Sequence, residues 1–429
     1  MLLTACSSDD GTTPGTIPSG TSPIQFSAGM GSGYKGATRA NNDIVEDGTP
    51  GTPLKTVYDS RGFGVFGCYT GLHYYSDSNV HPDFMYNQQV TWQTVPLSDP
   101  VDYAWTYTPL KYWPNGEGET NSSIVTGNNP HYVSFLAYAP WSDDEHPDPE
   151  NYPADYCIPS FSRQGEIGNP WLTYRLHSDV ANQVDLLCAQ PKLDQQKPDN
   201  GAPVHFVFRH ALACVGDRIN VSCTTGLQNQ IKGRVNGVSI KYAKLEVTDL
   251  RIEYTLTSKA RLVLWYVENN TNDALLNWQP ILSEAPQTKR TITLLDPDDP
   301  SDDWVVHTYD GTKSAPANPE DPDPRVTINP YKVVGRGVYY IPTELDGYPQ
   351  TAKVSITYHI ATSADGTSWK NEEDIVGTAT LTLKRYEDAY QSGKHLYINI
   401  SLSPMDIVLT AAIAPWIEVD PVEMEGVED

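Results

Sequence analysis

Short segments of alternating apolar and polar residues, each stopped by proline or glycine, constrain the fold of this chain most strongly. In HYVSFLAYAPW, for example, Val133, Phe135 and Ala137 share one face of a strand and Pro140 ends it. The chain of 429 residues contains 34 prolines, 31 glycines and 26 tyrosines, and long helical patterns are scarce. Many short strands with turn-rich connections are typical of β-sandwiches and barrels. We therefore predict an all-β protein.

Two polar stretches divide the chain. Residues 7–23 contain a single apolar residue, so we expect a flexible, disordered tether with too little apolar surface to fold. Residues 192–203 are polar, contain two prolines and one glycine, and are the best candidate for a domain junction. We predict a signal remnant and tether over 1–23, an N-terminal β-sandwich domain over 24–200 and a C-terminal one over 201–429.

The first ten residues, MLLTACSSDD, have the order of a bacterial lipoprotein signal: an apolar run, a small residue, Cys6, and then polar residues. A full signal begins with basic residues and has an apolar core of about 7–15 residues, whereas only four residues separate Met1 from Cys6. We predict that Cys6 carries a lipid and links the chain to the membrane. The alternative is an unmodified cysteine in a disordered tail.

Charge and motifs exclude several function classes. With 54 acidic against 29 basic residues the net charge is −25, which argues against nucleic-acid binding. The sequence has no GxSxG, P-loop, dinucleotide or HExxH motif. His205 and His210 lie five apart, so a strand would place them on opposite faces. The acidic segment at 296–303 lacks the glycine and glutamate of an EF-type calcium loop. We predict no catalytic residue, no metal site and no cofactor, and hence no enzyme.

Five further cysteines follow Cys6. They are Cys68, Cys157, Cys188, Cys214 and Cys223. Their spacing contains no CxxC pair, and chains of this size rarely need disulfides. Buried thiols are favoured over one or two bridges.

Both ends of the folded region are predicted to be strands. In the N-terminal segment 24–30, Ile24, Phe26 and Ala28 alternate with polar or small residues. The C-terminal segment 406–419 alternates in the same way through Ile407, Leu409, Ala411 and Ile413, with Trp416 near its end. A terminal strand can leave its own sheet and complete that of another subunit, and such head-to-tail contacts build open filaments. Cleavage after Arg39 would free segment 24–30 and open a groove. The alternative is that both strands close their own domains.

Aromatic residues are dense in the first half. They include Tyr74, Tyr75, Trp105, Tyr107, Tyr112, Trp113, Tyr138 and Trp141. Flat rings can bind sugars, but aromatic side chains also fill sandwich cores. Core packing is the favoured interpretation, and a glycan-binding surface lipoprotein remains the alternative function.

Several motifs, taken in order, resemble the fimbrillin family of lipoprotein pilus subunits from Gram-negative anaerobes. The motifs are LLTAC, IQFSAGM…TRA, GFGVFGCY, DFMYNQQVTW, AWTYTPLKYWP, VSFLAYAPW, DLLCAQ, VHFVFRHALACV and KHLYINISL…IVLTAAIAPW. The resemblance implies two transthyretin-like β-sandwich domains, export as a lipoprotein, and a place in the outer membrane or in a fimbria. It implies a non-catalytic, adhesive role and assembly with other pilus subunits by strand addition. An arginine-specific protease would cut after Arg39, with Arg61 second, and 406–419 would be the donor strand.

Overall fold

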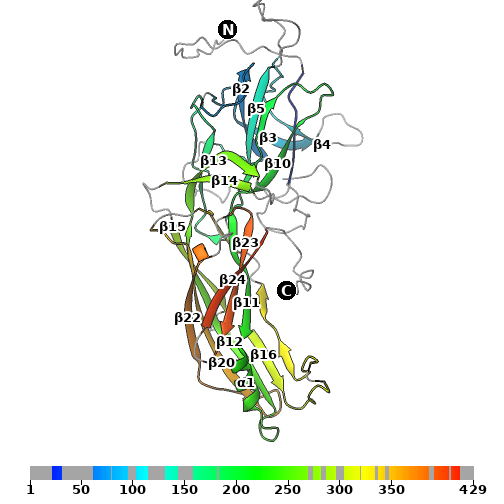
Figure 1. Cartoon of the computed structure of the whole chain (residues 1–429), viewed down its shortest axis with the longest axis vertical. Helices are drawn as coiled ribbons and strands as arrows, with labels where there is room; N and C mark the ends of the chain where they lie inside the picture. Colours follow the sequence, from blue (N-terminus) through cyan, green and yellow to red (C-terminus); the bar gives the residue numbers. More distant parts are fainter. Residues whose placement is uncertain are drawn as a thin grey trace, which may run out of the picture.

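The structure is a computed structural model, elongated along one axis (Figure 1). It describes residues 22–30, 61–78, 80–94, 103–114, 131–143, 158–180, 183–268, 274–281, 287–295, 304–318, 320–333, 337–343, 347–385, 391–404 and 407–415. In these segments the elements are nearly all strands, as predicted. Two packed pairs of sheets follow one another along the long axis, and we call them the upper and lower halves, as oriented in Figure 1.

The upper half is a sandwich of two sheets. The larger sheet has the order β1-β10-β8-β5-β2-β3-β4, with β9 paired to β5. Its strands are β1 (Phe26–Met30), β2 (Phe63–Gly71), β3 (Met85–Thr94), β4 (Tyr103–Thr106), β5 (Tyr132–Ala139), β8 (Leu187–Ala189), β9 (Lys192–Gln195) and β10 (Val204–His210). The smaller sheet, β14-β13-β7-β6, consists of β6 (Ser160–Phe161), β7 (Trp171–Arg175), β13 (Lys259–Glu268) and β14 (Ala274–Pro280).

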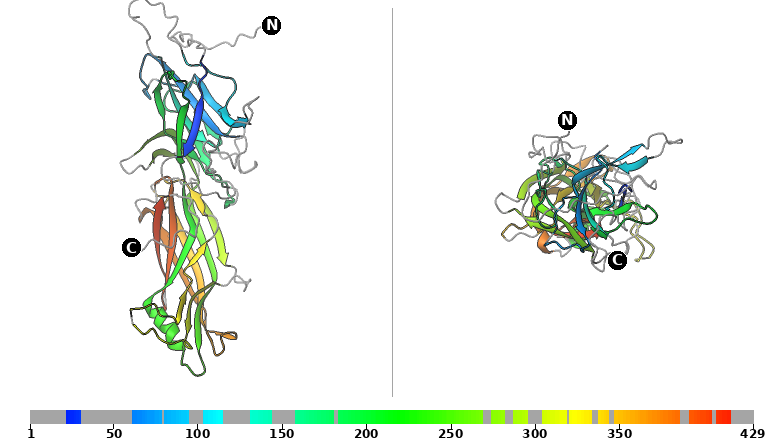
Figure 2. Two further views of the ribbon diagram at one scale, coloured as in Figure 1. Left: turned by 90° about the vertical axis from the view of Figure 1, so that its right-hand side faces the viewer. Right: turned by 90° about the horizontal axis from the view of Figure 1, so that it is seen from above.

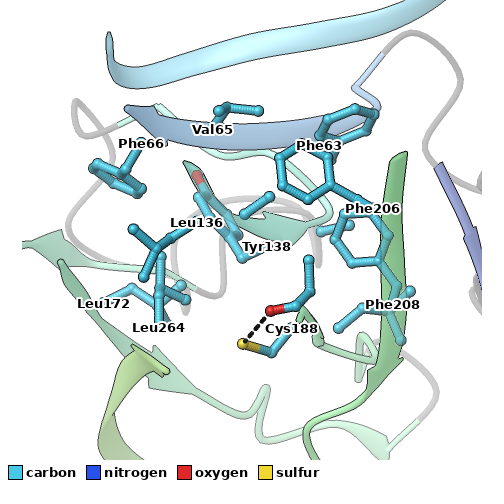
Figure 3. Packing of buried hydrophobic residues seen from close by; sticks show 14 of the residues in the cluster. Phe63, Val65, Phe66, Leu136, Tyr138, Leu172, Cys188, Phe206, Phe208 and Leu264 are labelled. Carbon is cyan, nitrogen blue, oxygen red and sulfur yellow. Dashed lines mark hydrogen bonds between the residues drawn. The ribbon is translucent and has the colours of Figure 1, made fainter. Parts of the chain in front are cut away.

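The upper core consists of buried side chains on both faces of the larger sheet, one of which packs against the smaller sheet. Its largest fully buried members include Phe63, Phe66, Phe135, Tyr138, Phe206 and Phe208. Figure 3 shows Phe206 and Phe208 of β10 directed toward Phe63 of β2, with Leu172 and Leu264 of the smaller sheet on the other side. Strand β5 ends at Ala139, directly before Pro140, as predicted from the missing backbone N–H of proline.

The lower half is a second sandwich. One sheet, β18-β11-β23-β24 with β19 paired to β11, consists of β11 (Ala213–Cys223), β18 (Tyr331–Val333), β19 (Val338–Tyr340), β23 (Lys394–Leu402) and β24 (Ile407–Pro415). The other, β17-β16-β12-β20-β21 with β15 on β12 and β22 on β20, consists of β12 (Tyr242–Thr257), β15 (Gln287–Leu295), β16 (Trp304–Asp310), β17 (Val326–Ile328), β20 (Thr351–Ser363), β21 (Trp369–Asn371) and β22 (Ile375–Thr382). A 3₁₀ turn, Leu383–Arg385, follows β22.

The lower core lies between these sheets. It contains Leu250 and Ile252 of β12 together with Leu396, Ile398 and Ile400 of β23, which share faces of their strands as the alternation predicts. Helix α1 (Thr225–Arg234) closes the far end of this half (Figure 1) by burying Leu227 and Ile231, four residues apart on one helix face. In the described segments no helix has the length and apolar composition to cross a bilayer.

The path of the chain crosses between the halves more than once. Strands β10, β13 and β14 lie after residue 200, but β10 pairs with β1 and β8, and β13 pairs with β7 and β14, all in the upper half. The division into domains 24–200 and 201–429, each expected to fold independently, stays a prediction. Any such upper unit also needs β10, β13 and β14 for its sheets.

An ionic cluster lies between β12 and β20. Glu246 and His359 are directly opposite each other in the two strands, and both residues are buried. His359 Nε2 lies 3.6 Å from Glu246 Oε2. His359 Nδ1 also bonds Asp374 Oδ1 (2.9 Å), and Lys244 Nζ donates to Glu246 Oε1 (2.6 Å). The Glu246 carboxylate, with Asp374, raises the pKa of His359, and His359, with Lys244, lowers the pKa of Glu246.

This cluster predicts a specific pH dependence of stability. A histidine with a raised pKa stabilises the fold below its ordinary pKa of about 6.5 and loses that contribution as pH rises. Glu246, with a lowered pKa, loses its contribution as pH falls below about 4.3. We expect His359→Gln to lower the unfolding temperature more at about pH 6 than at about pH 8. The exposed His73 supplies the control His73→Gln, and equal losses at both pH values would refute the prediction.

Candidate functional site at the two terminal strands

Strand β1 is an edge strand whose partner is distant in sequence. It runs parallel to β10, with Phe26 opposite Val204 and Met30 opposite Phe208. Just before β1, Ile24 N donates to Lys111 O (2.9 Å) and Trp113 N donates to Ser22 O (3.0 Å). Figure 2 shows β1, in dark blue, on the outside of the upper half. Spatial neighbours therefore hold this strand, and no hairpin joins it to β10.

The inward side chains of β1, and of Ile24 just before it, are nearly as buried as the interior of the protein. Ile24 is 1 % exposed, Phe26 4 % and Ala28 7 %, which confirms the predicted alternation. Burying a large apolar side chain contributes about 1.5–3 kcal/mol. Although it lies at a sheet edge, β1 is thus an integral part of the upper core, and its removal would expose that core.

Three aromatic rings line the place that Phe26 occupies. Its ring centroid lies 5.4 Å from Tyr107, 5.4 Å from Phe135 in an edge-to-face arrangement, and 5.6 Å from Phe206. We call this surface, lined by Tyr107, Phe135 and Phe206, the β1 slot. Burial raises the pKa of Tyr107 to about 12, so its hydroxyl is neutral and donates to Ile24 O (2.9 Å). The slot thus contacts both the apolar side chain of Phe26 and the backbone just before β1.

One polar contact marks the outward face of β1. The Ser27 hydroxyl is hydrogen-bonded to Nδ1 of His205, its neighbour on β10, at 2.9 Å. Both residues lie on the outer side of the sheet, where the His205 side chain is exposed. This contact links the two strands in one register without taking part in the core.

The two predicted cleavage sites differ in their surroundings. Arg39 lies outside the described residues. Arg61 lies two residues before β2, and its carbonyl oxygen accepts a hydrogen bond from Gln89 Nε2 (3.1 Å). The next residue, Gly62, is buried with φ +60°, and a Cβ there would lie 1.8 Å from Val90 O. Because proteolysis favours exposed loops over fixed backbone, this packing disfavours cleavage after Arg61.

Strand β24 forms the edge of its sheet in the lower half. It runs antiparallel to β23, from the pair Leu402 and Ile407 to the pair Lys394 and Pro415. Ile407 is buried, and the predicted inward residues Leu409, Ala411 and Ile413 are half-buried against the lower core. Trp416, the last predicted donor residue, lies outside the described residues, as does the lipidation candidate Cys6.

The inner face of β24 packs against β22 of the opposite sheet. A Cβ at Gly377 of β22 would lie 2.7 Å from Cγ2 of Ile407, so a glycine is needed for this close approach. Beside the contact, Val376 and Val408 are 72 % and 56 % exposed. The lower sandwich is therefore closed at this side by two edge strands, with apolar residues at the surface.

Most of the aromatic residues considered for sugar binding belong to the upper core. Trp105, Tyr107, Trp113 and Tyr138 are buried, and Tyr75 and Trp141 pack against the same core. Tyr74 and Tyr112 are 71 % and 40 % exposed. The six residues in or against the core confirm the predicted core packing, and they cannot form a surface platform for sugars.

The described residues offer little for covalent or metal chemistry. No cluster of three or more His, Cys, Asp or Glu side chains among them is arranged to hold a metal ion. The cysteines that the structure describes, Cys68, Cys188, Cys214 and Cys223, form no disulfide. Burial raises the pKa of Cys68 and of Cys223 to about 12, so these thiols are protonated and unreactive at neutral pH.

Comparison with known proteins identifies a similar sequence and a solved structure with the same fold. No family model matches the chain. The chain is 23 % identical over 376 residues to fimbrium subunit Fim1C of Phocaeicola vulgatus, covering 85 % of this chain and 84 % of that protein. The crystal structure of a fimbrial protein from Bacteroides vulgatus has the same fold, with a TM-score of 0.54 and 19 % identity over 92 % of this chain and all of that one.

Proposed function

We propose that this chain, which is a fimbrillin-like protein by sequence and by fold, is a non-catalytic fimbrial subunit that acts in adhesion at the cell surface. The motifs in the sequence and the named relative of similar length support this function. In this proposal its two β-sandwiches are of the transthyretin type. Export as a lipoprotein would place the lipid on Cys6 and the folded part of the chain outside the outer membrane.

We further propose that subunits assemble by strand exchange. The observation that carries this step is the position of β1. It is an edge strand without a hairpin connection to its partner β10, yet it fills the aromatic β1 slot. Cleavage after Arg39 would separate β1 from the rest of the chain, and an extended strand from another subunit would then cover the exposed apolar surface.

The proposed cut can be tested with two arginine variants. We expect the purified protein to form SDS-resistant ladders after treatment with an arginine-specific protease. Arg39→Ala should leave only monomer, because β1 stays attached and the slot stays filled. Arg61→Ala should behave as the wild type, because the backbone at Arg61 is held against β3. If the wild-type protein is cut after Arg39 and β1 is released, but the protein remains monomeric, strand exchange is refuted.

A further inference from the structure

Strand β22 is a sheet edge without the features that usually protect an edge. It pairs with β20 on one side, and within the described segments no strand pairs with its other side. Natural edges are kept from pairing with other chains by charged side chains, proline, bulges or short length. The eight residues of β22, IVGTATLT, include no charge and no proline, and their register with β20 is continuous. Nothing in this strand opposes the addition of a further strand.

The other described edge strands of the same sheet are protected. Strands β17 and β21 have only three residues each. Strand β15 is longer, but it carries Lys289 and Arg290. Strand β22 is therefore the long, uncharged edge of this sheet, and it lies on the outside of the lower half (Figure 1).

The outward side chains of β22 suit a strand that pairs on both sides. Val376 is 72 % exposed, and Thr378 and Thr380 are exposed as well. All three are β-branched, which favours strand formation, and opposite threonines are a favourable cross-strand pair. Strand β24, whose Ile407 packs against Gly377 of β22, contains no charged residue either. A second chain could thus approach this side of the sandwich without meeting like charge on either strand.

The charges at the two ends of β22 are of opposite sign. Residues 372–374, Glu-Glu-Asp, precede the strand, residues 384–385, Lys-Arg, follow it, and all five are exposed. Two parallel copies of β22 would bring like charges together at each end, whereas two antiparallel copies bring the acidic end of one to the basic end of the other. Because the chain has a net charge of −25, two copies repel each other in general. A neutral strand with complementary ends is a place where they can meet.

We propose that β22 pairs antiparallel with β22 of a second copy of this chain, about a two-fold axis at Ala379. Opposite residues in an antiparallel pair are of one hydrogen-bonding type, so the axis passes between one residue and its own copy. With the axis at Ala379, Thr378 lies opposite Thr380 of the second copy. Asp374, which also bonds His359 of its own copy, comes level with Lys384 of the second.

This contact is of the same kind on both copies, as a two-fold axis requires. It does not depend on the strand exchange proposed above, because β22 is neither the strand that fills the β1 slot nor the donor predicted at 406–419. Between assembled rows of subunits it would act sideways and join two rows that run in opposite directions. Contacts that are weak one by one would then add up along the rows.

Sedimentation of the uncut protein tests the pairing. We expect the wild type to shift from monomer to dimer as its concentration rises. Thr378→Lys/Thr380→Lys places like charges opposite each other twice in each dimer and should weaken the dimer about tenfold or more. Thr378→Glu/Thr380→Lys places opposite charges at the same two pairs and should restore the dimer. Both positions are exposed, so circular dichroism should show that each variant is folded as the wild type is.

A matched variant on β15 controls for added charge. Thr291 and Thr293 are exposed, lie two residues apart and belong to the same sheet. Thr291→Lys/Thr293→Lys adds the same charge away from β22 and should dimerise as the wild type does.

The outcomes bear on this contact alone. Wild-type protein that stays monomeric at every concentration overturns the proposal, and so does an equal loss of dimer in the β15 control. Loss of the dimer without rescue by Thr378→Glu/Thr380→Lys overturns the axis at Ala379 and keeps β22 as the contact. Since the uncut protein is used throughout, failure of this contact and failure of strand exchange, which is read from SDS-resistant ladders, are observed separately.

Discussion

Fixing β24 to its own sheet will abolish assembly. Ser401 of β23 and Val408 of β24 are opposite each other in the antiparallel pair, and both point away from the lower core. Opposite Cβ atoms in such pairs lie about 4.5–5.5 Å apart, a spacing from which a small shift allows a disulfide. In the oxidised Ser401→Cys/Val408→Cys variant, β24 cannot leave β23. We therefore expect only monomer after cleavage at Arg39, measured as loss of the SDS-resistant ladder.

Reduction provides the control for this lock. The same protein with its engineered disulfide reduced should assemble as the wild type, and so should each single cysteine variant. Because both positions are on the outer face, the substitutions leave the lower core unchanged. Ladders formed by the fully oxidised protein would show that a segment other than β24 is the donor.

Phe26→Ala will strongly destabilise the uncut protein and leave the assembled one unaffected. Replacing a buried phenylalanine by alanine costs about 3–5 kcal/mol, and Phe26 packs against three rings of the upper core. We expect a loss of up to about this size in the free energy of unfolding measured in urea. Once Arg39 is cut, β1 leaves, and the variant polymer should resist heating in SDS as well as the wild type does.

A variant on the other side of the same contact supplies the comparison. Phe206 lies on β10, is fully buried and remains in the protein after cleavage. Phe206→Ala should therefore weaken both the uncut monomer and the polymer. If Phe26→Ala weakens the polymer as much as Phe206→Ala does, β1 has not been replaced, and the exchange mechanism is wrong.

Local alternation made the terminal strands predictable, but it could not identify their partners. The pattern at Ile24, Phe26 and Ala28 indicates a half-buried strand because only an extended chain places them on one face. Nothing local indicates that β1 pairs in parallel with Val204–His210, about 180 residues later. For the same reason, the sequence does not reveal that Lys259–Glu268 joins the upper half through β7.

The fate of the aromatic residues shows a second limit. Trp113 and Tyr74 belong to similar stretches of sequence, but one is 3 % and the other 71 % exposed. An aromatic ring suits both a core and a surface platform, so residue type alone does not separate the two. Local sequence also does not show that the backbone at the cleavage candidate Arg61 is held in place. The hydrogen bond from Gln89 to Arg61 depends on the pairing of β2 with β3.

The two terminal strands lie on different halves of an elongated molecule, with β1 in the upper half and β24 in the lower half (Figure 2). In the proposed exchange, the acceptor slot (the socket) and the donor strand (the plug) are thus carried at separate places, and exchange between copies would extend a row of subunits head to tail. Such a row has a direction, with an open socket at one end and an unused plug at the other. A copy that escapes cleavage keeps its socket closed, can still offer its plug, and would end the growth of the filament in that direction.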